Sequence, residues 1–361
     1  MQADLRAAAR FFSSVESVAP VASLTHLHWV NASADQVSTV TPLLLDAGFA
    51  GTVVVARASQ QQAMGAFSAL NCALHDHPSA GQAAGDVLLE APQGREAAQL
   101  AIAQIQAAMV ECEPHTIWVF GDKESGIQSL AKRYVGASTA LSKGHLRLVR
   151  IPACAPLVEA TNKKGRAPFA FPTEANAFHT FTWDGLTLAT RPGVFSWRHA
   201  DAASTLLLKH LLAENLSGQW LDWGCGCGLL GAALLRQFPD LRVVMSDDHY
   251  RAAVCTQQTL DANALQARAQ VICEDGVGPR IGALAFDGVV TNPPFHRGVR
   301  LDRGVAQRFL RDAQSILKPG GVIWLVGNRH LDYGAALQRD FSQVSCVESN
   351  AQFHIWRAQR R

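Results

Sequence analysis

Short apolar runs alternate with longer amphipathic stretches through the second half of the chain. The apolar runs span residues 221–223, 241–245, 269–273 and 286–291, and each ends at polar or glycine-rich positions. Helical periodicity separates the first three runs, over roughly 228–238 and 252–263. This alternation predicts a parallel sheet with right-handed crossovers. Because ligands bind beyond the carboxyl ends of the strands in such sheets, the residues after each apolar run are the candidates for a site.

The first half of the chain repeats this alternation more weakly. Its candidate strands are residues 24–30, 52–56, 87–89, 116–120 and 146–150. The alanine-rich stretch 97–110 predicts a helix, but no glycine-rich loop followed by an acid at a strand end occurs here. We therefore predict two α/β domains, over 1–160 and 191–361, with a junction over 161–190 that contains the loop-like sequence 161–168.

The composition is that of a globular protein, with 48% hydrophobic and 17% charged residues among 361. A net charge of +2 excludes a surface coated in basic groups, so nucleic-acid binding has to come from local clusters. No apolar run reaches the length of a membrane span, and the first residues lack the layout of a secretory signal. The eight cysteines are scattered, which is typical of a reduced compartment, so we expect a cytoplasmic protein.

The strongest local pattern is Asp222-Trp-Gly224-Cys-Gly226-Cys-Gly228, directly after the first apolar run. Glycines at a strand end let the backbone approach a ligand closely, because no Cβ intrudes. Nucleotide-binding proteins use similar loops for a pyrophosphate. Here the loop begins with an acid, which suits a cationic sulfonium and an amino-acid ammonium better than a diphosphate. The two cysteines of the loop have no second pair at metal-ligand spacing, so we expect no metal.

Acids also follow the next two apolar runs. Asp247 ends the second run, where its carboxylate suits the two hydroxyls of a ribose. Asp275 follows the third run and is placed to accept a hydrogen bond from an adenine amine, with Glu274 as an adjacent competitor. Ordinary surface acids at strand ends are the plain alternative.

Asn292-Pro293-Pro294-Phe295 follows the fourth apolar run and indicates the reaction class. An exocyclic base amine is a poor nucleophile because its lone pair is delocalised into the ring. The Asn292 side-chain oxygen and the Pro293 carbonyl would each accept a hydrogen from that amine and aim its lone pair at a methyl donor. Proline fixes the backbone so that this carbonyl points outwards, and Phe295 offers a face for stacking a base. A base within a duplex would first have to be extruded.

Basic side chains gather directly after this turn, from Arg297 through Arg300 and Arg303 to Arg311. Arginines beside a pocket suit phosphate contacts and stacking on splayed bases. A solvated helix face is the alternative for any one of them. His296 either touches the base or a phosphate, or it has a structural role.

Several stretches resemble the small-subunit ribosomal RNA guanine-N2 methyltransferase C family and its relative that acts on the large subunit. In the second half these are residues 193–196 with Asp201, 222–228, 292–296 and 318–321. Residues 121–126 resemble the small-subunit type, whereas 328–333 resemble the large-subunit type. The chain has Ala203 two positions after Asp201, where the family usually has glycine.

The resemblance implies a Rossmann-like class I methyltransferase domain with a seven-stranded, mostly parallel sheet, preceded by a degenerate methyltransferase-like domain. It implies methyl transfer from S-adenosylmethionine to the N2 amine of a guanine in ribosomal RNA, with ribosomal RNA or a ribosomal subunit as partner. Phe195 and Asp201 would close over the methionine end of this cofactor, with core packing as an equal interpretation for Phe195. We expect a monomer.

Other classes of protein use parts of the same pattern. Asn-Pro-Pro-aromatic turns also serve enzymes that methylate adenine N6 in DNA or RNA, or a glutamine amide in a protein. A DNA enzyme would usually carry a target-recognition insertion, and a glutamine enzyme would lack the arginine cluster. A non-catalytic RNA-binding scaffold fits the first domain, whereas Asp222, Asp247 and Asn292 argue against it for the second.

Overall fold

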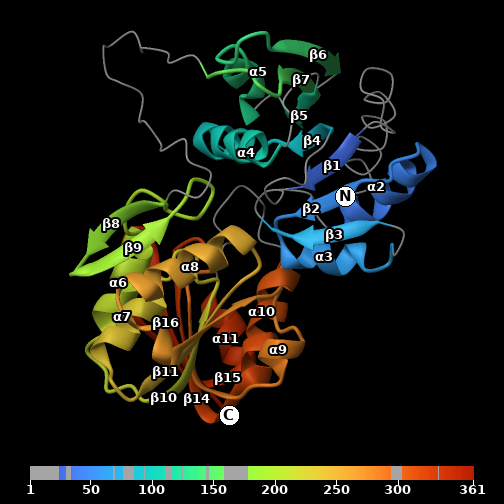
Figure 1. Ribbon diagram of the computed structural model, residues 1–361. Helices are drawn as coiled ribbons and strands as arrows, with labels where there is room; N and C mark the ends of the chain where they lie inside the picture. The colour runs from blue at the N-terminus through green and yellow to red at the C-terminus, as the bar shows by residue number, and fades with distance from the viewer. Residues whose placement is uncertain are drawn as a thin grey trace. The chain divides into compact units, whose positions relative to one another are not determined.

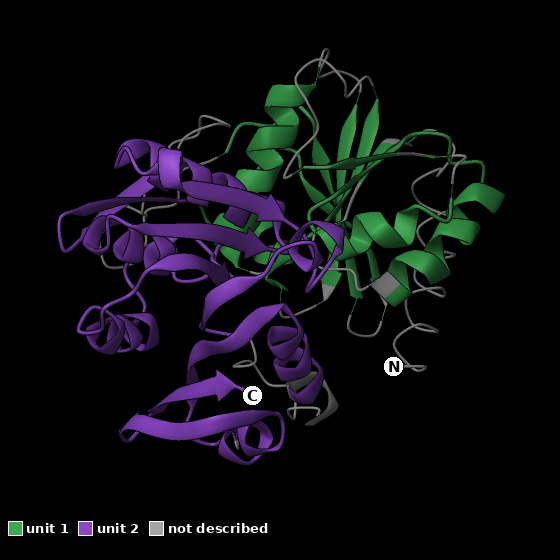
Figure 2. Ribbon diagram, turned by 90° about the horizontal axis from the view of Figure 1, so that it is seen from below, with its two compact units in different colours: residues 1–178, 191–193 green, residues 179–190, 194–361 purple. Residues whose placement is uncertain are grey.

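In the computed structural model, whose helices and strands are labelled in Figure 1, the chain forms two compact units. One consists of residues 1–178 and 191–193 and the other of residues 179–190 and 194–361, shown in green and purple in Figure 2. The structure describes residues 24–29, 34–67, 70–75, 85–92, 94–109, 115–122, 125–143, 146–157, 178–293, 303–331 and 333–361. Within these ranges no helix is long and apolar enough to cross a membrane.

The first unit is built around one mixed sheet. Its elements are β1 (Leu24–Trp29), α2 (Ala34–Asp46), β2 (Thr52–Val55), α3 (Ala58–Met64), β3 (Asn71–Leu74), β4 (Asp86–Glu90), α4 (Arg95–Ala108), β5 (Thr116–Asp122), α5 (Ile127–Ala131), β6 (Ser138–Lys143) and β7 (Leu146–Pro152). The strands are arranged in the order β3-β2-β1-β4-β5-β7-β6. Neighbours from β3 to β5 pair in parallel, whereas β7 is antiparallel to both β5 and β6.

Strand alternation divides the apolar residues of this sheet between two cores. Leu88 and Trp118 belong to the core that also contains residues of α2 and α3. Val87 and Ile117, one position earlier in each strand, belong to the core with α4 and α5. Because successive side chains of a strand point to opposite faces, the sheet is covered by helices on both sides.

The second unit contains a larger set of elements around a similar sheet. These are β8 (His179–Trp183), β9 (Leu186–Thr190), α6 (Ala202–Leu211), β10 (Gly218–Trp223), α7 (Leu229–Gln237), β11 (Leu241–Asp247), α8 (Tyr250–Ala262), η3 (Gln266–Arg268), β12 (Ala269–Cys273), α9 (Pro279–Gly282), β13 (Phe286–Thr291), α10 (Arg303–Ile316), β14 (Leu317–Asn328), α11 (Tyr333–Asp340), β15 (Phe341–Ser349) and β16 (Phe353–Arg360). The main sheet has the order β12-β11-β10-β13-β14-β16-β15.

The two sheets share one topology. In the second unit the strands from β12 to β14 pair in parallel, and β16 is antiparallel to β14 and β15. When the seven strands of each main sheet are numbered in chain order, the two sheets therefore have the same strand order. The expected seven-stranded α/β fold is confirmed in the second half of the chain, and so is a second domain of the same kind in the first half.

Side chains along β10 point alternately to the two faces of the sheet. Leu221 and Trp223 pack into the core with α10 and α11, and the ring of Trp223 stacks on Phe309 with the ring centroids 4.2 Å apart. Asp222 lies between them in the strand, so its side chain points to the opposite face of the sheet, towards α7.

The antiparallel hairpin of β8 and β9 belongs to the second unit, although residues 179–190 were expected in the junction. Asn263, just after α8, accepts a hydrogen bond from the backbone nitrogen of Thr187 at 3.0 Å and donates one to its carbonyl at 2.7 Å. The hairpin is therefore fastened to the sheet domain by α8. The loop-like sequence 161–168 lies outside the described residues.

Candidate active site

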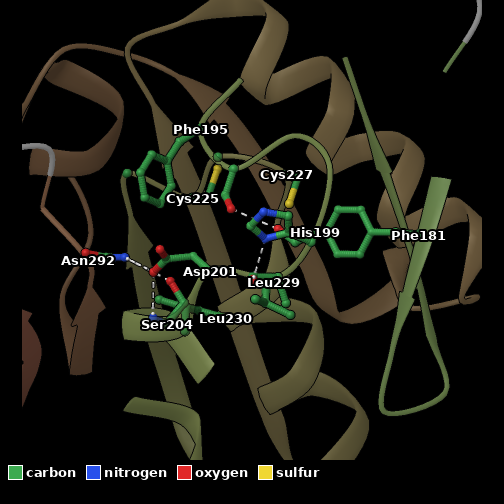
Figure 3. Close-up of a pocket in the computed structure, with 14 residues that line it drawn as sticks. Phe181, Phe195, His199, Asp201, Ser204, Cys225, Cys227, Leu229, Leu230 and Asn292 are labelled. Carbon is green, nitrogen blue, oxygen red and sulfur yellow. Dashed lines mark hydrogen bonds between the residues drawn. The ribbon is translucent and has the colours of Figure 1, made fainter. Parts of the chain in front are cut away.

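A pocket opens at the carboxyl ends of β10 and β13 in the second unit (Figure 3). Its walls come from the glycine loop over 224–227, the start of α7, the segment 195–204 that leads into α6, Phe181 of β8 and Asn292 after β13. This is the edge at which the sequence pattern places the candidate residues. All of these walls belong to the second unit.

The glycine loop exposes its backbone to this pocket. Gly224 and Gly226 have φ angles of +76° and +58°, a region that side chains with a Cβ rarely adopt. A Cβ added at either position would meet no atom within 4 Å. The open space over both glycines is therefore the room that a ligand lying against the loop needs.

Asp247 holds the loop from the end of β11. Its Oδ2 accepts a hydrogen bond from the backbone nitrogen of Gly226 at 3.0 Å, and its Oδ1 accepts one from that of His249 at 2.8 Å. The carboxylate is thus fixed between the glycine loop and the start of α8. Each oxygen has a second lone pair, so the predicted contact with ribose hydroxyls is compatible with this arrangement and stays a prediction.

Two threonines of α8 support the loop from the other side, and the sequence analysis did not identify them. Thr256 Oγ1 donates to the carbonyl of Gly226 at 3.0 Å. Thr259 Oγ1 donates to the carbonyl of Cys227 at 2.8 Å and accepts from the backbone nitrogen of Ala189 in β9 at 2.9 Å. The two side chains are three residues apart and therefore share one helix face. That spacing shows a shared helix face, but nothing in the sequence shows which groups this face contacts.

Asp222 is fully buried and does not line the pocket. Its Oδ2 accepts from the backbone nitrogen of Gly231 in α7 at 2.9 Å, an approach that a Cβ would hinder because it would lie 3.1 Å from this oxygen. Its Oδ1 is buried without a hydrogen-bond partner among the described residues. Burial raises the pKa of Asp222 to about 7, and the nearby negative charge of Asp247 adds to the rise. Asp222 therefore lies behind the loop, and its role in holding a cationic ligand stays a prediction.

The loop cysteines are buried thiols. Burial is the largest cause that raises the pKa of Cys225 well above its usual value and that of Cys227 to about 11. Both side chains therefore stay protonated at neutral pH. No group of three metal-binding side chains occurs among the residues that the structure describes.

The two adjacent acids after β12 have separate surroundings. The carboxylate of Glu274 accepts from the backbone nitrogens of Arg280 and Ile281, at 3.1 and 2.9 Å, and so caps the short helix α9. Asp275 is exposed. The structure thus gives Glu274 a capping role and leaves Asp275 as the candidate for an adenine amine.

Asn292 lies against the start of α6 (Figure 3). Its Nδ2 is 2.9 Å from Asp201 Oδ2 and 2.9 Å from Ser204 Oγ. Asp201 is the N-cap of α6, and the same Oδ2 accepts from the backbone nitrogen of Ser204 at 2.9 Å. Phe195 is 52% exposed at the rim of the pocket, which excludes the core-packing interpretation for this side chain.

The structure brings together the glycine loop, Phe195, Asp201 and Asn292. It adds Ser204, Phe181 and His199 to the pocket lining, none of which the sequence pattern singled out. Five predicted residues lie outside the described part of the chain: Pro294, Phe295, His296, Arg297 and Arg300. Arg303 is the first residue of α10, and Gly228 is the N-cap of α7.

Fold and pocket together place the chain among the class I methyltransferases. Residues 185–357 match the family model described as the Methyltransferase small domain. The ribosomal RNA small subunit methyltransferase C of Hahella chejuensis is 31% identical over 76% of this chain and 77% of its own length. The ribosomal RNA small subunit methyltransferase C of Alteromonas mediterranea is 31% identical over 76% of this chain and 72% of its own length. The chain belongs to the ribosomal RNA small subunit methyltransferase C family.

A solved structure agrees over both units. The T. thermophilus 16S rRNA N2 G1207 methyltransferase, in complex with AdoMet and guanosine, is 27% identical, with a TM-score of 0.74 over 93% of this chain and 88% of that chain. The likeness therefore extends beyond the second unit into the first.

Proposed function

We propose that the protein transfers a methyl group from S-adenosylmethionine to the exocyclic N2 amine of a guanine in 16S ribosomal RNA. The observation that carries the proposal is the position of Asn292 beside the glycine loop, in one pocket. Membership of the family and the relative that was solved with AdoMet and guanosine support the choice of cofactor and base. The adenine and glutamine alternatives lack such support.

The glycine loop and the acids after β11 and β12 fit the cofactor. The open backbone at Gly224 and Gly226 gives the space, Asp247 suits the ribose, and Asp275 suits the adenine amine. The buried Oδ1 of Asp222 lacks a partner among the described residues, and a positive charge near the loop would stabilise its ionised form. When bound, S-adenosylmethionine would supply a methyl group on a sulfonium, which is a reactive donor because a neutral thioether is the leaving group.

The chain's own contribution is to hold and orient the amine. Asn292 Oδ1 and the carbonyl of Pro293 accept hydrogen bonds from the two N–H groups of the guanine amine, which draws the nitrogen towards tetrahedral geometry. Thr291 Oγ1 donates to the carbonyl of Trp223 at 2.7 Å, so the tips of β13 and β10 are fixed to each other. The acceptors after β13 therefore keep a constant distance from the loop after β10. Positioning and charge placement of this kind supply much of the rate of such a transfer.

Basic side chains that follow the turn at Asn292 in the sequence suit the RNA. Arg308 and Arg311 are exposed on α10, the helix that follows the turn at Asn292. Together with Arg297, Arg300 and Arg303 they would contact phosphates or stack on bases beside the target. We place the protein in the cytoplasm as a monomer that acts on ribosomal RNA or the small subunit, with catalysis assigned to 191–361.

Nucleoside mass spectrometry of 16S ribosomal RNA from a strain that lacks the gene tests this function. We expect one N2-methylguanosine to disappear and to return when the intact gene is supplied. Loss of an N6-methyladenosine in its place would refute the choice of base. An unchanged nucleoside profile would refute the ribosomal substrate.

A further inference from the structure

We propose that Asp201 and Ser204 are positioning residues that fix the orientation of the Asn292 amide. This inference rests on the proposed function and deepens it. It gives the start of α6 a role in positioning the amine that is methylated. Asp201 was expected to close over the cofactor. Asp201 lines the pocket, and its carboxylate also contacts Asn292, the residue proposed to hold the base.

Both hydrogens of the Asn292 Nδ2 have an acceptor on the first turn of α6. One partner is Asp201 Oδ2 and the other is Ser204 Oγ, each at 2.9 Å. An amide nitrogen carries only two hydrogens, so these two bonds account for both. The partners come from segments that are 91 and 88 residues away in the sequence, so the pairing exists only in the folded domain.

The carboxylate decides which way the amide faces. An ionised carboxylate accepts hydrogen bonds and has none to donate, so only the nitrogen side of the Asn292 amide can lie against Asp201. A rotated amide would place its oxygen against the carboxylate oxygen. The side-chain oxygen of Asn292 is therefore directed away from α6, as Figure 3 shows. That oxygen is the acceptor that the proposed reaction needs.

The position of Asp201 also strengthens this acceptor. Asp201 caps α6, and the partial positive charge at a helix start stabilises a carboxylate there. An amide whose N–H groups donate to a carboxylate is polarised, which places more negative charge on its oxygen. Asp201 therefore acts on the guanine amine through Asn292 without touching it.

Asp201→Asn separates this role from helix capping. Asparagine caps a helix about as well as aspartate, so α6 should keep its start. An asparagine at 201 can also donate, so it no longer selects one orientation of Asn292. Thr205→Ala is the matched control, because Thr205 Oγ1 donates to the carbonyl of Asp201 at 2.9 Å in the same turn and does not bond Asn292.

The activity test is a double-mutant cycle on the full chain with 16S ribosomal RNA as substrate. We expect Asp201→Asn to lower kcat about 10- to 100-fold and to leave the dissociation constant of S-adenosylhomocysteine within about twofold, with Thr205→Ala close to wild type. In an Asn292→Ala background, Asp201→Asn should have no further effect, because its target is gone. Equal losses in both backgrounds would overturn the proposal, and so would weakened cofactor binding with normal kcat.

A second readout does not depend on the reaction. With 15N-labelled asparagine, the two side-chain NH2 proton signals of Asn292, identified by their loss in Asn292→Ala, should lie away from the usual positions of a solvated amide in the wild type, because one proton is bonded to a carboxylate. In Asp201→Asn these signals should move towards the usual positions. Unchanged signals in that variant would overturn the proposal even if kcat fell. If the wild type makes no N2-methylguanosine, the proposed function fails, whereas the NMR signals still decide the orientation of the amide.

Discussion

At the scale of the residue, the buried carboxyl of Asp222 makes the stability of the second unit depend on pH. Its carboxyl is fully buried, and burial raises its pKa to about 7. The folded protein therefore holds this proton up to higher pH than the unfolded chain does. Stability from this group is present below about pH 4 and is lost as the pH rises through about 7.

Asp222→Asn should remove this pH-dependent loss of stability, because asparagine has a similar side-chain shape but does not ionise. The free energy of unfolding of the variant relative to the wild type should rise between about pH 4 and pH 7, by at most about 4 kcal/mol, and level off above pH 7. Urea unfolding at a series of pH values measures it. Asp261→Asn, at an exposed acid on α8, is the control and should show no such rise. A pH-independent difference for Asp222→Asn would contradict the assignment of the raised pKa.

Local patterns made some of the site residues predictable from sequence. The glycine loop and Asn292-Pro293 are contiguous motifs whose meaning depends on their place after a strand, and the strands were readable as apolar runs. Ser204 and Thr259 belong to no such motif. Their roles come from partners 88 and 70 residues away, which no single sequence displays.

At the scale of elements, the helix α8 connects the parts of the site. Thr256 and Thr259 bond the carbonyls of the glycine loop, and Thr259 and Asn263 bond the backbone of β9. One helix face therefore ties the loop to the hairpin that carries Phe181. A substitution on this helix face should therefore change both the stability of the domain and the shape of the pocket.

Thr259→Val keeps the side-chain shape and removes the hydroxyl. The buried nitrogen of Ala189 then loses its acceptor, so the free energy of unfolding should fall by about 1–3 kcal/mol. Affinity for S-adenosylhomocysteine should fall as well, because the loop loses its bond at Cys227. Calorimetry of both properties checks this. Thr39→Val, whose hydroxyl bonds only within α2, is the control, and equal effects from the two variants would refute the role of α8.

Elements differed in how well the sequence predicted them. The strands β12 and β13 coincide with the predicted runs over 269–273 and 286–291. β13 lies between two parallel neighbours, and a strand buried in this way reads as a continuous apolar run. The edge strands β3 and β6 of the first sheet were missed, whereas the edge strand β12 of the second sheet was predicted. An edge strand has a neighbour on one side only, so polar residues are tolerated there and the apolar signal fades.

At the scale of the whole molecule, one strand order occurs twice in the chain. Only the second unit has a glycine loop after its first central strand. In the first unit the residues that follow β1 are Val-Asn-Ala-Ser over 30–33, without glycine. We therefore propose that the first unit binds RNA or supports the fold and that it does not take the cofactor.

Titration calorimetry with S-adenosylhomocysteine should accordingly give one site per chain. Gly226→Ala should weaken this single site at least about tenfold, because a Cβ would enter the space over the loop. Gly320→Ala is the matched control, since Gly320 has a similar positive φ of +78° and does not line the pocket. Two sites per chain, or a site that survives in Gly226→Ala, would contradict this division of roles.

Methylation of 16S ribosomal RNA by the purified Asn292→Ala variant is the most direct test of the account. The measurement is the rate of N2-methylguanosine formation, together with the affinity for the cofactor. We predict a rate at least about 100-fold below wild type, because the variant lacks the acceptor for the amine, with cofactor affinity within about twofold, because the glycine loop and Asp247 are unchanged. Asn350→Ala, which alters an exposed turn of the same unit, should keep the wild-type rate. A wild-type rate of N2-methylguanosine formation by Asn292→Ala would contradict the account.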